Sequence, residues 1–183
     1  MSTSVLTPGV PRAPEHLVWT GLGGDSLPLA IASVAHQHDS LVVVVTPDMQ
    51  TAELLQEQVT FFAAQQALPV TTFPDWETLP YDSFSPHPDI VSERLATLYA
   101  LPEQRRGLLI VPAPTLLQRL PPCDYITRNS LILKTGDSLN LDAMRTRLES
   151  AGYRCVSQVM EHGEFAVRGS LLDLYPMGNP LPF

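Results

Sequence analysis

Two uninterrupted apolar runs constrain the fold of this chain more than any other feature. Leu41–Val45 is rich in β-branched residues and is ended by Pro47, and Leu108–Val111 is a second such run that Pro112 ends. Short continuous apolar runs are typical of strands buried on both faces of a parallel sheet. The two runs therefore predict a parallel sheet flanked by helices, which is an α/β fold class.

The segments around these runs fit the same class. Asp48 is a predicted helix cap, and apolar side chains follow it at helical spacing: Met49, Ala52, Leu55, Val59 and Phe62. A short strand at 70–73 and a helix at about 89–101 complete an alternation of strands and helices. This order indicates right-handed crossovers within one parallel sheet.

A different pattern begins near residue 128. Short strands surround one helix there, with the expected elements at 130–134 (strand), 135–137 (turn), 141–151 (helix, ended by Gly152), 156–160 (strand) and 170–175 (strand). This pattern is typical of a small α+β unit, and we expect that unit to be incomplete at its end. We therefore divide the chain into a flexible leader at 1–16, an α/β domain at 17–127 and an α+β domain at 128–183.

The charge is unevenly distributed along the chain. Residues 1–127 hold 13 acidic and 5 basic side chains, whereas residues 128–183 hold 6 of each. Nucleic-acid binding needs a basic surface, so the first segment is predicted to bind DNA poorly. The second segment could present a local basic surface, or its charges could form an ordinary solvated face. The sequence shows no secretion signal and no apolar stretch long enough to cross a membrane, so we expect a cytoplasmic protein without membrane contact.

A glycine-rich segment at 21–24 lies at the expected start of a helix in the α/β domain, where a phosphate-binding loop would lie. Gly21, Gly23 and Gly24 could form its turn, but Asp25 stands near the position of the required lysine, and the only lysine of the chain is Lys134. Without that cation the loop lacks the main electrostatic catalyst for phosphoryl transfer. We therefore predict a degenerate, non-functional phosphate loop, no catalytic residue and no cofactor. A residual NTPase or helicase domain is the alternative.

Other candidate chemistry is weak. The acidic and aromatic segment 74–87 resembles a general acid/base pocket only superficially, and buried aromatic residues with exposed acids would explain it equally well. Cys123 and Cys155 are far apart and lack partners at metal-ligand spacing, so no metal site is expected.

The segment Glu161–Gly169 is the remaining candidate. Gly163 and Gly169 bracket a short element that could present Phe165 and Arg168 to a partner. A hairpin with one core phenylalanine and one surface arginine would give the same pattern.

Four motifs add a resemblance to these observations: 75–87 (DWETLPYDSFSPH), 152–154 (GYR), 159–169 (VMEHGEFAVRG) and 172–176 (LDLYP). From about Leu41 onward the chain resembles the start of bacterial transcription-repair coupling factors, the Mfd family. In that family this region is similar to the excision-repair protein UvrB. The resemblance implies a domain shaped like a P-loop ATPase, similar to UvrB domain 1a, followed by a UvrA-docking domain similar to UvrB domain 2. The 74–89 connection is too short for the DNA-engaging hairpin of UvrB.

The resemblance also implies partners and site residues. UvrA is the expected partner, and Arg168 is the most secure contact because it lies in an Arg-Gly pair shared with UvrB. Glu164 and Phe165 are expected to flank the contact, and Arg154 to contribute. RNA polymerase and DNA are expected to be contacted only by later domains. The implied function is a non-catalytic adaptor of transcription-coupled repair; the alternative is a regulatory module that binds the carboxy-terminal part of its own full-length chain.

Overall fold

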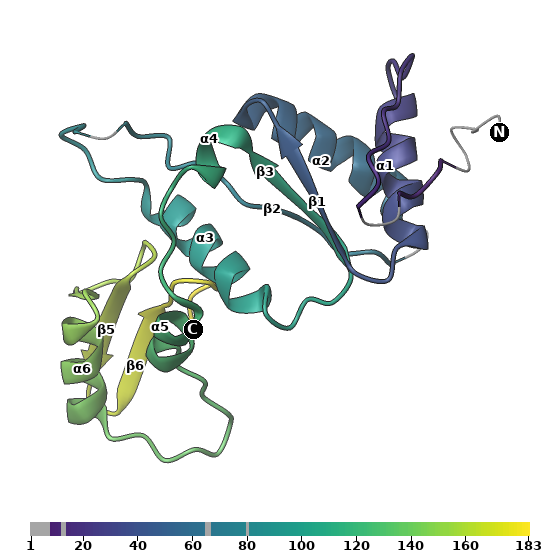
Figure 1. Ribbon diagram of the computed structural model, residues 1–183. Coiled ribbons are helices and arrows are strands. Elements are labelled where there is room, and N and C mark those ends of the chain that lie inside the picture. Colours follow the sequence, from purple (N-terminus) through teal and green to yellow (C-terminus); the bar gives the residue numbers. More distant parts are fainter. Residues whose placement is uncertain (1–7, 12–13, 65–66, 80) are drawn as a thin grey trace. The chain divides into compact units, whose positions relative to one another are not determined.

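The computed structural model describes residues 8–11, 14–64, 67–79 and 81–183. The chain forms two compact units (Figure 1). One comprises Met1–Asp75 and Leu101–Gln118, and the other comprises Trp76–Ala100 and Arg119–Phe183. Much of the predicted leader, residues 1–7 and 12–13, lies outside the described residues. The units interleave along the sequence, so they do not correspond one to one to the domains divided at 127/128, and that division stays a prediction.

The first unit contains the predicted parallel sheet. Its strands are β1 (Leu41–Thr46), β2 (Val70–Thr72) and β3 (Gly107–Pro112), and they lie in the order β1-β3-β2 with both pairs parallel. The α/β fold class is therefore confirmed. β3 is buried along its whole length because it has a neighbour on each side.

Two helices pack on this sheet (Figure 1). They are α1 (Ser26–Gln37) and α2 (Met49–Ala63). Asp48 caps α2 as predicted, since its carboxylate accepts a hydrogen bond from the Thr51 N–H at 2.7 Å. The core joins side chains of both helices to β3, with Ile31, Ala35, Ala52, Leu55, Val59, Leu108 and Ile110 among its members. A short helix, α4 (Ala113–Leu116), follows β3.

The prediction that Leu41–Val45 is buried on both faces is wrong for β1. Val43 is 51% exposed and Val45 is 53% exposed, whereas Val42 and Val44 face the core. Successive side chains of a strand point to opposite faces, and α1 and α2 cover only the face of Val42 and Val44. The apolar run thus predicted the strand, but it did not show which of its faces is packed against other elements.

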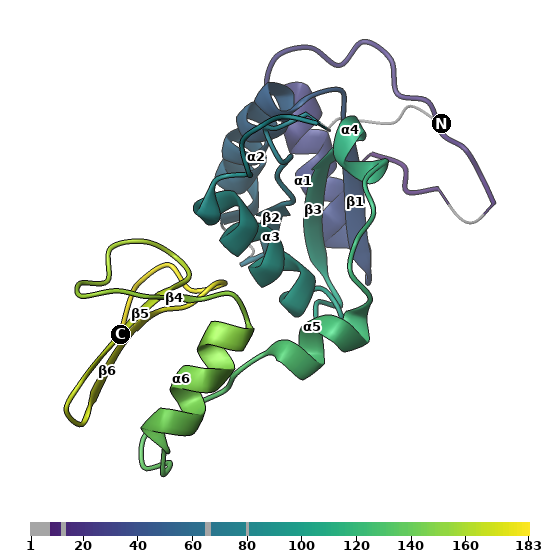
Figure 2. The ribbon, with the colours of Figure 1, turned by 90° about the vertical axis from the view of Figure 1, so that its left-hand side faces the viewer.

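The second unit surrounds a small mixed sheet. The strands β4 (Arg154–Cys155), β5 (Glu164–Arg168) and β6 (Leu171–Tyr175) lie in that order, with β4 parallel and β6 antiparallel to β5. Figure 2 shows β4 and β6 beside β5. The helices of this unit are α3 (Pro88–Ala100), α5 (Cys123–Asn129) and α6 (Leu141–Ser150). Met144 and Leu148 of α6 pack on Phe165 and Leu174.

Two predicted strands of this unit are absent from its described residues. Residues 130–134 form no strand, and Ile132 in their middle is 67% exposed. Residues 156–160 leave the sheet after the Val156 N–H bonds to the Phe165 carbonyl, and at the end of this segment the Met160 N–H donates to a side chain described below. The predicted turn near Gly136 and the predicted helix at 141–151 are confirmed, and Gly152 ends that helix with φ of +88°.

None of the described helices combines the length and apolar character needed to cross a membrane.

Candidate protein-docking site

The β5–β6 hairpin carries the residue that the sequence singled out most strongly. Arg168 ends β5 opposite Leu171, and Gly169 adopts φ of +62° in the connecting turn, a conformation that favours glycine. The Arg168 side chain is 64% exposed and donates to the carboxylate of Asp173 on β6. The hairpin therefore presents an exposed guanidinium that an intramolecular acid already orients.

Phe165 lies in the core rather than on the surface. Its exposed fraction is 0%, and it packs with Met144, Leu148 and Leu174. β5 is the central strand and α6 covers this face of it, so a side chain at Phe165 has no route to solvent. The expectation that this ring is presented to a partner is corrected accordingly, and Phe165 supports the hairpin from within.

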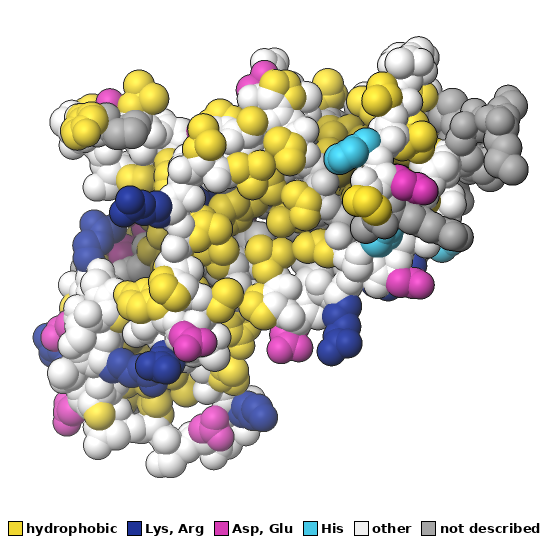
Figure 3. Space-filling model, in the orientation of Figure 1, with side chains coloured by type: hydrophobic (Ala, Val, Ile, Leu, Met, Phe, Trp, Pro, Cys, Tyr) yellow, Lys and Arg dark blue, Asp and Glu magenta, His cyan; other side chains and the backbone are white. Residues whose placement is uncertain are grey.

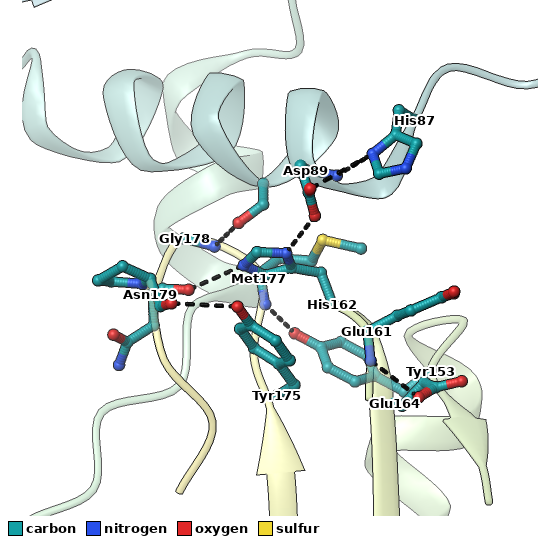
Figure 4. Close-up of polar contacts among 12 residues, drawn as sticks. His87, Asp89, Tyr153, Glu161, His162, Glu164, Tyr175, Met177, Gly178 and Asn179 are labelled. Carbon is teal, nitrogen blue, oxygen red and sulfur yellow. Dashed lines mark hydrogen bonds and ion pairs between the residues drawn. The ribbon is translucent and has the colours of Figure 1, made fainter. Parts of the chain in front are cut away.

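Glu164 holds the loop that precedes it. One of its carboxylate oxygens accepts the N–H groups of Met160 at 2.9 Å and Glu161 at 3.0 Å, and the other accepts from Arg154 at 3.1 Å. Figure 4 shows the bond between Glu161 and Glu164. These two backbone N–H groups, aided by the Arg154 charge, lower the pKa of Glu164 despite its burial. The carboxylate replaces strand pairing for residues 160–161, which explains why no strand forms there. Glu164 therefore does not flank the docking surface as an exposed contact.

Arg154 lies at the other end of the sheet from Arg168. It donates to Glu161 at 2.9 Å as well as to Glu164, and its side chain is 61% exposed. Because Arg154 pairs with Glu164 at the start of β5, four residues of strand separate it from Arg168, a spacing of about 13 Å. The structure therefore shows two separate exposed arginines: Arg168 at the end of β5, and Arg154 on β4 beside the start of β5. Figure 3 shows Lys and Arg side chains interleaved with Asp and Glu over this unit.

The degenerate phosphate loop closes on itself. Gly21 and Gly24 have φ of +76° and +53°, and the Ser26 hydroxyl donates to the Gly23 carbonyl at 2.7 Å. Asp25 precedes α1 without capping it and lies beside a shallow pocket of about 300 Å³ that Glu57 also lines. Pro28 removes one N–H donor from the first helical turn. An anion bound here would lie near the carboxylates of Asp25 and Glu57, and the first turn of α1 would offer it one backbone N–H group fewer because of Pro28.

The acidic and aromatic segment is built differently from the expectation. Leu79, Tyr81 and Phe84 are 74%, 104% and 81% exposed, so the interpretation of buried aromatic residues is wrong for this loop. Near its start the buried guanidinium of Arg94 lies 3.9 Å from the ring centre of Trp76. Within the described ranges, no group of three or more His, Cys, Asp or Glu side chains could hold a metal ion.

A polar cluster around His162 was missed by the sequence reasoning (Figure 4). The ring of His162 is bonded to Asp89 of α3 and to the backbone carbonyl of Asn179, and it lies against the ring of Tyr175. His162 and Asp89 are 73 positions apart in the sequence. No local pattern announces such a pair, although a histidine beside a turn glycine was visible.

Comparisons with known proteins agree with this picture. The family described as UvrB interaction domain matches residues 131–182, which include the hairpin. A transcription-repair-coupling factor of Escherichia coli is 50% identical over 172 residues, covering 94% of this chain and 15% of that protein. One of Haemophilus influenzae is 46% identical over 184 residues, covering 100% of this chain and 16% of that protein. One of Staphylococcus epidermidis is 29% identical over 168 residues, covering 91% and 14%.

The chain thus spans only 14–16% of the length of these relatives. Over nearly all of its own residues the chain is nevertheless similar to one segment of transcription-repair-coupling factors.

Proposed function

We propose that this chain is a protein-binding module that docks the repair protein UvrA through the β5–β6 hairpin, in the manner of UvrB. The observation that carries the proposal is the exposed, oriented Arg168 inside the segment that matches the UvrB interaction domain. Arginine suits such a contact because its planar fork can hold a carboxylate with two parallel hydrogen bonds.

The surroundings of Arg168 favour exchange of partners. Asp173 holds the guanidinium in an exposed ion pair, and exposed pairs contribute little stability, so a carboxylate on UvrA could replace or share it at small cost. Arg154 supplies a second exposed cation on β4, beside the start of β5. In this arrangement Phe165 and Glu164 act indirectly, by fixing the strand and its preceding loop.

The first unit is proposed to be inactive toward nucleotides. A phosphate loop needs a lysine to meet the triphosphate, and the loop at Gly21–Gly24 offers Asp25 instead. In the full-length protein we propose that the module recruits UvrA to stalled RNA polymerase, while contact with the polymerase and ATP-driven movement on DNA belong to other parts.

Titration calorimetry with UvrA tests the proposed contact. Arg168→Ala should weaken binding by about 2 kcal/mol, roughly 30-fold, if Arg168 is a hot spot. The matched control is Arg145→Ala on α6, which removes an arginine that is also exposed and singly paired, here with Glu149. Equal affinities for the two variants would remove Arg168 from the site.

The alternative is that the same surface binds the remainder of its own full-length chain. Its basis is that most of the length of the relatives lies outside this segment. A competition experiment separates the two functions, since the remainder of the chain would displace UvrA only if both use the hairpin. Binding of both at once would show that the hairpin serves UvrA alone.

A further inference from the structure

The side chain of His162 joins three segments that are distant in the sequence. It lies in the turn before β5 and is only 10% exposed. Its Nδ1 is 2.8 Å from a carboxylate oxygen of Asp89 on α3, and its Nε2 is 2.9 Å from the carbonyl oxygen of Asn179 after β6. Its ring centre lies 4.0 Å from that of Tyr175 (Figure 4). Both ring nitrogens therefore face oxygen atoms.

Both of these oxygens are hydrogen-bond acceptors. A peptide carbonyl cannot donate, and an ionised carboxylate cannot donate either. A neutral imidazole has one N–H group and one lone pair, so it can serve only one of the two oxygens. The imidazolium has two N–H groups and serves both. The geometry thus matches the protonated ring.

The other charged and titratable groups around the ring fit a cation. Asp89 and Glu93 of α3 line the same pocket as His162, whereas the carboxylate of Glu161, which precedes His162, is paired with Arg154. From β6 the ring meets Tyr175, whose hydroxyl donates to the Pro180 carbonyl. A protonated His87 would compete with His162 for the charge of Asp89, because its Nδ1 lies 3.5 Å from the other oxygen of that carboxylate.

The contacts of His162 hold both open ends of the docking hairpin. The residue after it, Gly163, pairs with the Tyr175 carbonyl at the base of β5 and β6. The segment after β6 is held by two further bonds, from the Gly178 N–H to Ser92 on α3 and from the Met177 N–H to the Tyr153 hydroxyl. The histidine therefore ties the start of β5 and the exit of β6 to α3.

We propose that His162 is a protonated clasp, a positioning residue whose two N–H groups hold the β5–β6 hairpin on α3. Loss of the proton breaks one of the two bonds and loosens the hairpin at its base. If the hairpin docks UvrA, as proposed above, its affinity for UvrA therefore falls as pH rises.

The protonation state is tested by NMR of the ¹⁵N-labelled chain, independently of UvrA. The ring signals are assigned by their loss in His162→Gln. We expect both ring nitrogens of His162 to show the protonated signature near neutral pH, and to lose it together with shifts in the amide signals of Gly163 and Gly178 as pH rises. A neutral ring with one bare nitrogen at neutral pH would overturn the proposal.

Asp89→Asn separates a protonation clasp from a merely structural contact. The amide can donate to Nδ1 of a neutral ring while Nε2–H still donates to Asn179, so every bond survives without the extra proton. This variant should keep its fold, show a neutral His162 ring, and lose the pH dependence of the Gly163 and Gly178 signals. Asp124→Asn on α5, which removes an exposed paired carboxylate, is the control and should behave as wild type. A protonated ring in Asp89→Asn would contradict the proposal.

Calorimetry with UvrA then tests the consequence. Between about pH 6 and about pH 9 the wild-type affinity should fall by up to roughly tenfold, the scale of one charge-assisted bond, whereas the Asp89→Asn affinity should fall less. If Arg168→Ala leaves UvrA binding unchanged but the NMR result holds, the clasp stands and the proposed function fails. If UvrA binding depends on Arg168 while the ring is neutral, the clasp fails alone.

Discussion

Two segments of this protein are framed by glycines with positive φ, and their surroundings differ. Gly21 and Gly24 adopt positive φ in the first unit, as Gly163 and Gly169 do in the second. The Ser26 hydroxyl donates to the Gly23 carbonyl and closes the first loop, beside the carboxylate of Asp25, which accepts from the side-chain amide of Gln58. The second pair frames a strand whose neighbours are fixed by a buried carboxylate and a nearly buried histidine. Backbone geometry alone thus makes a turn, and organised side chains are what make a surface fit for recognition.

The largest effect is expected from removing the core side chain beneath the docking hairpin. Phe165→Ala should lower the free energy of unfolding of the second unit by about 3–5 kcal/mol, because it leaves a cavity under β5. Denaturation of a Trp19→Phe background, in which Trp76 alone reports, measures this. Phe84→Ala is the control in the same unit, where the ring is 81% exposed, and should change stability by no more than about 0.5 kcal/mol. Similar losses in both variants would contradict the burial of Phe165.

A smaller effect is expected at Glu164. Its folded-state pKa is lowered from the ordinary value of 4.5, so its contribution is present above that value and is lost as pH falls through the lower folded-state pKa. Glu164→Gln should cost about 1–3 kcal/mol at neutral pH, because the amide oxygen accepts these N–H bonds more weakly than the carboxylate. It should also flatten the fall in stability at acid pH. Glu161→Gln, which changes an exposed carboxylate of the same loop, should leave the acid dependence intact.

The two loops can be compared directly by the same substitution. Gly24→Ala and Gly169→Ala place a Cβ in open space, so each should cost only the backbone strain of a positive φ, about 1–2 kcal/mol. Thermal unfolding should therefore show similar losses. Titration with UvrA should differ, with weaker binding for Gly169→Ala alone. Weaker binding for Gly24→Ala would extend the docking surface to the first unit.

No effect is expected from adenine nucleotide at the first loop. A ligand that binds only the native state raises the melting temperature, so ATP with Mg²⁺ should leave the melting temperature unchanged if the loop is inactive. A protein with an intact phosphate loop serves as the positive control. A rise that grows with ATP concentration would favour a residual NTPase.

Much of the fold was predictable because its signals are local. The cap and periodicity of α2, the glycine that ends α6, the apolar runs of β1 and β3, and the α/β class follow from residues within one element or its immediate neighbours. The predicted strands at 130–134 and 156–160 failed because a strand needs a partner, and the partner lies elsewhere in the sequence. For residues 160–161 that partner was the carboxylate of Glu164 instead.

The candidate site shows the same division. An arginine at the turn of a hairpin is visible in the sequence, and Arg168 is indeed exposed there. The sequence did not reveal which side of β5 faces α6, so it could not exclude Phe165 from the surface.

The sequence by itself determined that the glycine loop carries Asp25 and no lysine, because the identity of a residue does not depend on how the chain folds. Only the tertiary structure decided that Phe165 is core, that one face of β1 is open, and that His162 meets Asp89. The physical reason is that burial and hydrogen-bond pairing are properties of distant segments brought together, and no single segment encodes them.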